Sequence, residues 1–126
     1  MTAIKVVDAS AVAALLFGEP EAEAVAQRLT GARLLSTVLL DFELSSVCWK
    51  KCRRDPRRRD AYLAAYWLCD RLAIEVAAVD RGAALEVALK TGLTVYDASY
   101  LWLSRSLSAE LVTLDVALER EARAGR

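Results

Sequence analysis

The chain has 126 residues, and its 17 Lys and Arg balance its 17 Asp and Glu, so no net charge favours nucleic acid or an acidic partner. It contains no His, which excludes a Ser-His-Asp triad, a Cys-His pair and every imidazole metal ligand. Its three Cys are too few for a four-thiolate zinc site, and an odd number without a secretion signal predicts reduced, buried thiols in a cytoplasmic protein.

We expect one domain over residues 1–126, with no membrane span because no stretch approaches ~18 consecutive apolar residues. The run IKVV predicts a first strand that ends at Asp8, and SAVAALLF predicts a helix that stops at Gly18. The further predicted elements are, in chain order, a helix over 19–31, a strand over 33–36, helices over 38–54 and 57–72, a strand over 73–79, helices over 80–92 and 97–107, a strand over 109–115 and a helix over 116–124. This alternation predicts an α/β fold, a three-layer sandwich with a central parallel sheet of about four to five strands.

Three aspartates stand where predicted strands end or helices begin. Asp8 and Asp115 follow strands, and the carboxyl ends of parallel strands share one edge of a sheet, so both are expected in one crevice. Asp97 begins a predicted helix, and both Asp8 and Asp97 lie in the tripeptide DAS, which adds Ser10 and Ser99 as hydroxyls that can cap a helix or orient a carboxylate. Each aspartate alone is read most simply as a helix N-cap, but three together favour a site.

The predicted helix over 38–54 carries two further acids. Its apolar stripe consists of Leu40, Leu44, Val47 and Cys48. Asp41 and Glu43 flank that stripe on opposite sides, and spacing alone does not choose which of them leans over the sheet edge. Phe42 and Trp49 point away from the stripe, which indicates either a partner surface or packing under the next helix. Most aromatic side chains of the following segment, residues 61–69, are expected in the core.

Four blocks, VVDASAV, DFELSSV, TVYDASYLWLS and LVTLDVAL, resemble in order and spacing the acidic blocks of PIN-domain ribonucleases, in particular the VapC-type toxins of toxin-antitoxin pairs. The resemblance spans nearly the whole chain. The acidic quartet that it implies is Asp8, Glu43, Asp97 and Asp115. It selects Glu43 over Asp41 and puts Ser10 at the hydroxyl position that often accompanies the first aspartate. Some members carry one more acid where this chain has Leu118, so Asp115 is the member of the quartet with the weakest support.

Carboxylates that lie close together repel one another unless a cation neutralises them, and oxygen ligands favour a hard ion, Mg²⁺ or Mn²⁺. We expect Asp8, Asp97 and Asp115 to hold the ion and Glu43 to orient or deprotonate a water that attacks a phosphodiester. The expected function is therefore that of a metal-dependent endoribonuclease, the toxin of a VapBC-type pair. The resemblance also implies a homodimer and a cognate VapB-type antitoxin that blocks the crevice.

The segment KKCRRDPRRR, residues 50–59, holds seven Lys or Arg and is the candidate for binding the RNA backbone. It can equally be a solvated turn or a docking site for an acidic partner. The alternative for the whole chain is a catalytically silent PIN-like module that binds RNA or protein, with the acids serving as caps. A phosphatase of the haloacid dehalogenase type is disfavoured because Ser10 stands where its second aspartate belongs.

Overall fold

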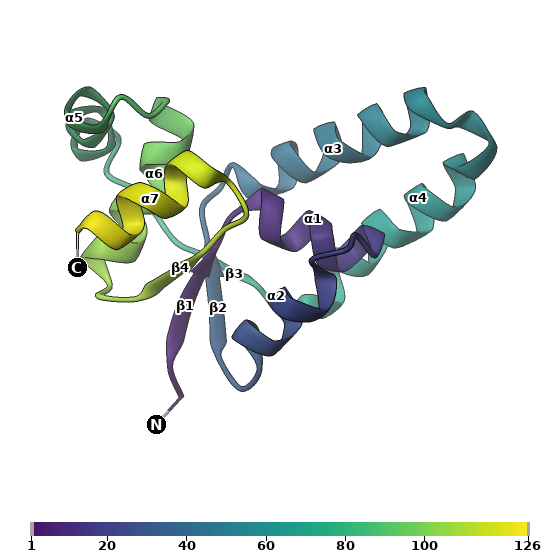
Figure 1. Cartoon of the computed structure of the whole chain (residues 1–126), viewed down its shortest axis with the longest axis horizontal. Helices are drawn as coiled ribbons and strands as arrows, with labels where there is room; N and C mark the ends of the chain where they lie inside the picture. Colours follow the sequence, from purple (N-terminus) through teal and green to yellow (C-terminus); the bar gives the residue numbers. More distant parts are fainter. Residues whose placement is uncertain (1, 126) are drawn as a thin grey trace.

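The computed structural model describes residues 2–125, and within that range four short parallel strands form one sheet (Figure 1). The strands are β1 (Ile4–Val7), β2 (Arg33–Ser36), β3 (Glu75–Val76) and β4 (Glu110–Val112). Their order in the sheet is β3-β2-β1-β4. The chain therefore moves outwards from β1 to β3 and then returns to place β4 on the other side of β1. This reversal between β1 and β4 is a topological switch point, where open α/β sheets bind their ligands.

Helices cover both faces of this sheet. In the described part of the chain there are seven α-helices, α1 (Ala9–Phe17), α2 (Ala22–Leu29), α3 (Leu40–Arg54), α4 (Arg59–Trp67), α5 (Arg81–Thr91), α6 (Val95–Ser106) and α7 (Val116–Ala124). Two 3₁₀ turns, η1 (Pro56–Arg58) and η2 (Leu68–Leu72), flank α4. Figure 1 shows α3 and α4 as a hairpin that extends away from the sheet, with α5, α6 and α7 grouped on the opposite side.

The core lies in two parts, one on each face of the sheet. Successive side chains of β1 point to opposite faces, so Val6 packs with Tyr100 and Leu118 while Val7 packs with Val12 and Leu44. All six are less than 2 % exposed. The first group belongs to α6 and α7, and the second to α1 and α3. This arrangement confirms the predicted three-layer α/β sandwich with a four-stranded parallel sheet.

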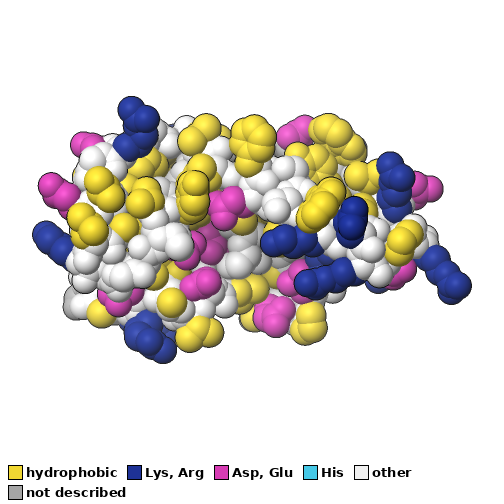
Figure 2. Space-filling model, turned by 90° about the horizontal axis from the view of Figure 1, so that it is seen from above, with side chains coloured by type: hydrophobic (Ala, Val, Ile, Leu, Met, Phe, Trp, Pro, Cys, Tyr) yellow, Lys and Arg dark blue, Asp and Glu magenta, His cyan; other side chains and the backbone are white. Residues whose placement is uncertain are grey.

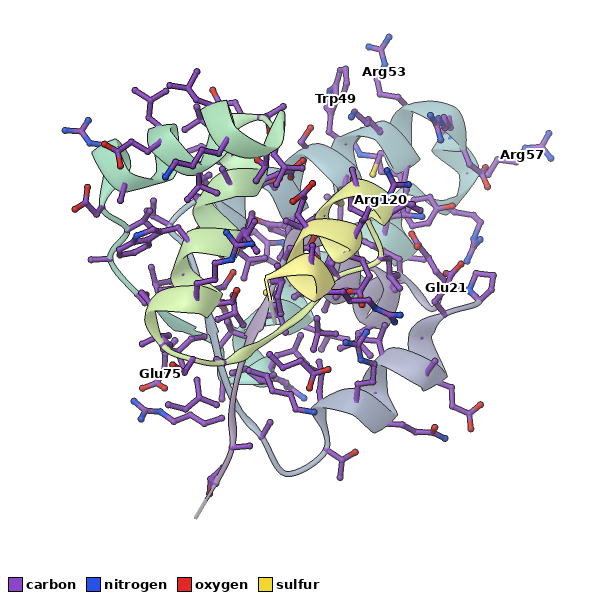
Figure 3. All side chains as sticks on the ribbon, turned by 60° about the vertical axis from the view of Figure 1, so that its left-hand side comes forward. Glu21, Trp49, Arg53, Arg57, Glu75 and Arg120 are labelled. Atoms are coloured by element: carbon purple, nitrogen blue, oxygen red, sulfur yellow. The ribbon has the colours of Figure 1, made fainter. Side chains whose placement is uncertain are left out.

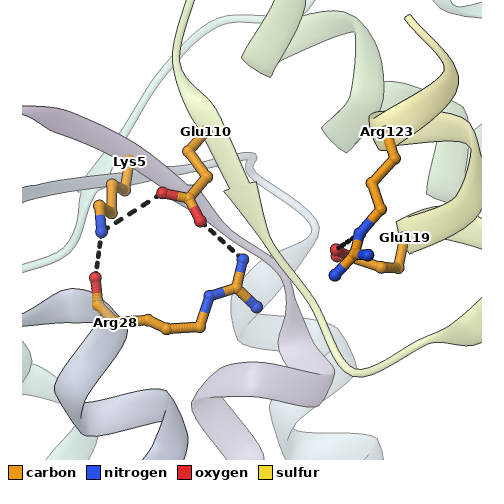
Figure 4. A network of polar contacts seen from close by, with 5 residues as sticks. All are labelled: Lys5, Arg28, Glu110, Glu119 and Arg123. Carbon is orange, nitrogen blue, oxygen red and sulfur yellow. Dashed lines mark hydrogen bonds and ion pairs between the residues drawn. The ribbon is translucent and has the colours of Figure 1, made fainter. Parts of the chain in front are cut away.

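A polar network joins β1, α2 and β4 at the amino end of the sheet (Figure 4). Glu110 accepts a hydrogen bond from Arg28 at 2.7 Å and lies 3.3 Å from the Lys5 ammonium, which also donates to the carbonyl of Arg28. The hydrogen bond from Arg28 lowers the pKa of Glu110, and the one from Lys5 adds to the shift. Because Lys5 and Glu110 are register partners, the network fixes how β1 and β4 align. That alignment in turn sets the positions of their carboxyl ends.

Two predicted strands are shorter than expected. The predicted strand over 73–79 is reduced to Glu75–Val76, because β3 is an exposed edge strand that pairs only with β2. The strand expected to run to Asp115 ends at Val112, since the next residues bond to the side chains of Asp8 and Ser10 instead of to a neighbouring strand.

The helix boundaries also differ from those predicted. The helix expected to start at Asp97 begins at Val95, because the hydroxyl of Thr94 caps it by accepting from the Asp97 amide at 3.1 Å. The helix expected over 57–72 is α-helical only in its middle, between two 3₁₀ turns. No residue of α4 is fully buried and Trp67 is 68 % exposed, whereas Tyr66 is half-buried and packs against the core. The expectation that most aromatic residues of this segment lie in the core therefore holds only in part.

The three cysteines are free thiols. Cys48 is buried, whereas Cys52 and Cys69 are only half-buried, so the expectation of buried thiols holds fully for the first alone. Within residues 2–125 no helix combines the length and the apolar character that a membrane crossing requires.

Candidate active site

Asp8 stands directly after β1 at the switch point and is only 5 % exposed. Its Oδ1 accepts hydrogen bonds from the Ser10 hydroxyl at 2.7 Å and from the Ala11 amide at 3.1 Å, which makes Asp8 the N-cap of α1. Its Oδ2 accepts a third bond, from the Thr113 hydroxyl at 2.5 Å. The carboxylate thus caps α1 and also bonds to Thr113, in the segment that connects β4 to α7.

The β4–α7 loop is joined to Asp8 and to the first turn of α1 by the same side chains. The amide of Leu114 donates to the Ser10 hydroxyl at 2.9 Å, and the amide of Asp115 donates to the Thr113 hydroxyl at 3.0 Å. The side chain of Asp115 is exposed and accepts from the amide of Leu118 at 2.9 Å, as the N-cap of α7. Hydrogen bonds therefore join the two segments that carry Asp8 and Asp115.

Asp97 lies in the first turn of α6 and is half-buried. Because Thr94 caps this helix, the carboxylate of Asp97 is not needed as a cap, contrary to the simplest interpretation of its position. Ser99 does not orient it, since the Ser99 hydroxyl donates to the carbonyl of Tyr96 at 2.6 Å. Asp97 is thus a helix-start acid whose carboxylate remains available to the site.

The two acids of α3 lie in different places. Glu43 is half-buried, and its Oε1 accepts a hydrogen bond from the hydroxyl of Tyr100 at 2.6 Å. Asp41 lines a separate small cavity of about 170 Å³, together with Tyr66 and Cys69. The structure thus separates the two candidates that spacing left open, and it places Glu43 on the side of the other acids.

All four predicted acids line one cavity of about 270 Å³. The side chains around it belong to Asp8, Ala9, Ser10, Glu43, Ser46, Val47, Lys50, Asp97 and Asp115. Figure 2 shows acidic side chains near the middle of this face, with Lys and Arg side chains beside them on the side of the α3–α4 hairpin. Of the basic run 50–59, Lys50 lines the cavity, whereas Arg57 projects outward from the turn of the hairpin (Figure 3).

The acids influence one another's ionisation. Burial raises the pKa of Asp8, and the charge of Asp97 adds to the shift, although hydrogen bonds from Thr113 and Ser10 oppose it. Burial also raises the pKa of Glu43, with smaller contributions from Asp8 and Asp97. The pKa of Asp97 is raised by burial and by the charge of Asp115. Such mutual repulsion is what a bound cation relieves.

Two residues of the site were not identified from the sequence. Thr113 stands two residues before Asp115, and this Thr-x-Asp spacing is the signal that points to a side chain shared between the two segments. Lys50 belongs to the predicted basic run, and it follows Glu43 by seven residues, two helical turns, so it lies on the same face of α3. The hydroxyl of Tyr100 has no such local signal, because its partner is 57 residues away. Leu118, where the resemblance allows another acid, is fully buried in the core.

Comparison with known proteins agrees with this geometry. The family model of the PIN domain matches residues 5–124. Ribonuclease VapC3 from Pyrobaculum aerophilum is 36 % identical over 115 residues, which cover 87 % of this chain and 88 % of that protein. The crystal structure of PAE2754, also from Pyrobaculum aerophilum, matches with a TM-score of 0.74 and 28 % identity over 98 % of this chain and 89 % of that one. This chain therefore belongs to the PIN domain family, in its VapC-type branch.

Proposed function

We propose that this protein is a metal-dependent endoribonuclease, the toxin of a VapBC-type toxin-antitoxin pair acting in the cytoplasm. The observation that carries the proposal is the convergence of Asp8, Glu43, Asp97 and Asp115 on one cavity at the topological switch point. The related protein VapC3 is named a ribonuclease, which supports the same reaction class for this chain.

The donor set of the cavity fits a hard divalent cation. Its ionisable donors are carboxylates, with the Ser10 and Ser46 hydroxyls nearby and no imidazole or thiolate among the residues that line it. As the side chains of residues 2–125 lie, no three His, Cys, Asp or Glu are close enough to hold a metal together. Mg²⁺ commonly binds through one or two carboxylates and keeps several waters. We therefore assign Asp8 and Asp97 as direct ligands of Mg²⁺, or of Mn²⁺, and Asp115 as a ligand that acts through water.

The bound cation would stabilise charge on the phosphoryl oxygens and make a nearby water more acidic. In the proposed hydrolysis the water oxygen bonds to phosphorus, and Glu43 accepts the proton of that water. The bond from phosphorus to the leaving ribose oxygen breaks, and this oxygen takes up a proton from solvent water. Lys50 binds a phosphate of the RNA backbone beside the acids, which otherwise repel it. The four carboxylates and Lys50 thus divide metal binding, proton transfer and substrate binding.

The test is cleavage of total cellular RNA by the purified wild-type protein and by Asp97→Asn, each with Mg²⁺, with Mn²⁺ and with EDTA. We expect discrete fragments only from the wild-type protein and only with a divalent ion. Cleavage by Asp97→Asn at the wild-type rate, or undiminished cleavage in EDTA, would contradict the metal site. No cleavage by folded, antitoxin-free wild-type protein would favour the silent interaction module.

We further propose that an antitoxin segment docks along the hairpin and that the chain forms a homodimer. A cavity of about 390 Å³ lies between α3 and α4, with Trp49 and Leu63 as apolar walls and Arg53 and Arg59 as cations. These side chains suit an amphipathic acidic segment. Trp49→Glu is expected to abolish binding of the cognate antitoxin and leave RNA cleavage unchanged. Light scattering tests the dimer, for which the expected mass is twice the 13.8 kDa of one chain.

A further inference from the structure

Tyr100 brings a phenol hydroxyl to the site from inside the core. Its side chain is 1 % exposed and packs with Val6 and Leu111 beneath α6. It lies one helical turn after Asp97, and its hydroxyl donates to Oε1 of Glu43 at 2.6 Å. The hydroxyl thus links α6, which carries one acid of the site, to α3, which carries another.

Packing alone does not require this hydroxyl. A Phe ring would fill the same space, whereas a buried hydroxyl must find a hydrogen-bond partner to offset its desolvation. The partner found here is the acid of α3 that lines the catalytic cavity, and not a backbone carbonyl. The position therefore combines a core ring with a polar group directed at the site.

Glu43 is the predicted acid for which such a partner matters most. Asp8 is fixed by three hydrogen bonds, and Asp115 by the amide that it caps. Glu43 has a longer side chain with more rotatable bonds, and hence more conformational freedom to lose. A bond to Oε1 restricts this freedom and leaves Oε2 as the oxygen available to the cavity.

We propose that Tyr100 is a positioning residue, whose buried hydroxyl holds one carboxylate oxygen of Glu43 so that the other faces the attacking water. This inference rests on the proposed ribonuclease function and names a residue through which that function acts. Tyr100 itself is not among the residues that line the cavity. In this proposal Tyr100 affects the reaction only through Glu43. Experiments can therefore distinguish this effect from a general effect of Tyr100 on folding.

The first experiment is steady-state cleavage of an RNA substrate by Tyr100→Phe, by Glu43→Gln and by the double variant. Loss of a supporting hydrogen bond typically lowers activity between about 10-fold and 100-fold, and we expect Tyr100→Phe to lower kcat in that range with KM unchanged. Glu43→Gln is expected to lower kcat by about 10²-fold or more. Because Tyr100 acts through Glu43, the double variant should be no slower than Glu43→Gln. The matched control is Tyr62→Phe, on α4, which should cleave like the wild type.

A second pair of variants separates the hydrogen bond from the packing. Replacing Tyr100 by p-fluorophenylalanine keeps the volume but removes the donor, whereas p-aminophenylalanine keeps a donor in place of the hydroxyl. We expect only the amino variant to recover most of the wild-type kcat. Mn²⁺ affinity, measured by calorimetry, should be unchanged in both, since the ligands of the ion are left intact.

A wild-type kcat in Tyr100→Phe or in the fluoro variant would overturn the positioning role and leave the ribonuclease function standing. Losses that multiply in the double variant would also overturn it, because they would show that Tyr100 acts independently of Glu43. If the wild-type protein does not cleave RNA under any condition, the proposed function itself fails. The outcomes for the inference and for the function are therefore distinct.

Discussion

At Asp8 the two carboxylate oxygens have different partners. Oδ1 caps α1 through the amide of Ala11, as many helix-start aspartates do, whereas Oδ2 bonds to Thr113 on the other side of the switch point. A cap alone needs only the first of these bonds. The second explains how a nearly buried carboxylate is tolerated between two loops, because hydrogen bonds offset part of its desolvation.

Removal of the Thr113 hydroxyl should therefore weaken both the fold and the site. In Thr113→Val, Oδ2 of Asp8 loses its donor and the amide of Asp115 loses its acceptor, while the side-chain volume is kept. We expect the free energy of unfolding to fall by about 1–3 kcal/mol, measured by urea denaturation, and Mn²⁺ affinity to fall as well. The control is Thr30→Val, at an exposed site whose hydroxyl bonds only within its own turn. Equal stability of the two variants would contradict this role of Thr113.

Asp97 should oppose folding when no cation is present. Its folded-state pKa lies above the ordinary value of 3.8, so the folded protein binds this proton more tightly than the unfolded chain does. Stability from this group is therefore greatest below that ordinary value and is lost as pH rises through the folded-state pKa. At pH 7 in EDTA, Asp97→Asn is expected to raise Tm by roughly 2 °C, whereas Asp60→Asn, at an exposed site on α4, should not.

Divalent ions should reverse this order of stability. A ligand that binds only the folded state stabilises it by about 2.7 kcal/mol at a hundredfold excess over its Kd. Saturating Mn²⁺ is therefore expected to raise the Tm of the wild-type protein above that of Asp97→Asn. The same Mn²⁺-dependent rise in both proteins would show that Asp97 is not a ligand.

The sequence allowed the acids to be predicted but not all of their partners. Asp8, Asp97 and Asp115 stand at helix starts, and the carboxyl edge of a parallel sheet brings such positions together. The choice of Glu43 over Asp41 came from the family resemblance. Both residues flank the apolar stripe of the helix, and helical periodicity does not show which flank faces the site. The link from Tyr100 to Glu43 joins residues 57 positions apart, and a contact of this kind depends on tertiary packing that no local pattern encodes.

At the scale of elements, α3 carries both a carboxylate and a cation of the site. Glu43 and Lys50 are two turns apart and line the same cavity, and the neighbouring stripe of Leu44 and Cys48 anchors the helix in the core. The helix thus sets the distance between the proposed proton acceptor and the proposed phosphate contact. Arg57, beyond the end of α3, projects away from this cavity (Figure 3).

This geometry predicts different roles within the basic run. For single-stranded nucleic acid, each lost phosphate contact lowers the slope of log affinity against log salt by about 0.7. We expect Lys50→Ala to lower the slope by that amount and to weaken binding, whereas Arg57→Ala should change it less. The measurement is a salt titration of RNA binding in EDTA, so that no cleavage occurs. Identical slopes for wild type and Lys50→Ala would contradict a phosphate contact at Lys50.

Elements with strong periodic patterns or clear capping signals were predicted well, and marginal ones were not. The helix from Arg81 to Thr91 lies between Asp80 as N-cap and Gly92 as a left-handed C-cap, and both signals are local. β3 is only two residues long because it pairs with a single neighbouring strand. A run of apolar residues does not indicate how many neighbours a strand will have. The exposure of α4 likewise depends on the hairpin leaving the body of the protein, which its composition does not reveal.

Over the whole molecule, the sheet edge that carries the four acids and the α3–α4 hairpin differ in how many buried side chains anchor them. The acids are anchored by β1, β4 and helices with buried side chains, including six buried residues of α6. The second arm of the hairpin, residues 56–72, contains no fully buried side chain in η1, α4 or η2. A cavity carried by elements with many buried side chains lies beside an arm with none fully buried, and this would let the proposed chemistry and partner binding occupy neighbouring surfaces.

This difference predicts uneven hydrogen exchange in the free protein. Regions with few buried contacts open at lower free energy, and a difference of about 1.4 kcal/mol corresponds to tenfold faster exchange. We expect amides of α4 to exchange at least about tenfold faster than those of α6, as measured by mass spectrometry at neutral pH. Binding of the cognate antitoxin along the hairpin should slow exchange in α4 and leave α6 nearly unchanged. Equal protection of α4 and α6 in the free chain would mean that the hairpin is anchored by contacts that its exposed side chains do not show, such as those of a dimer.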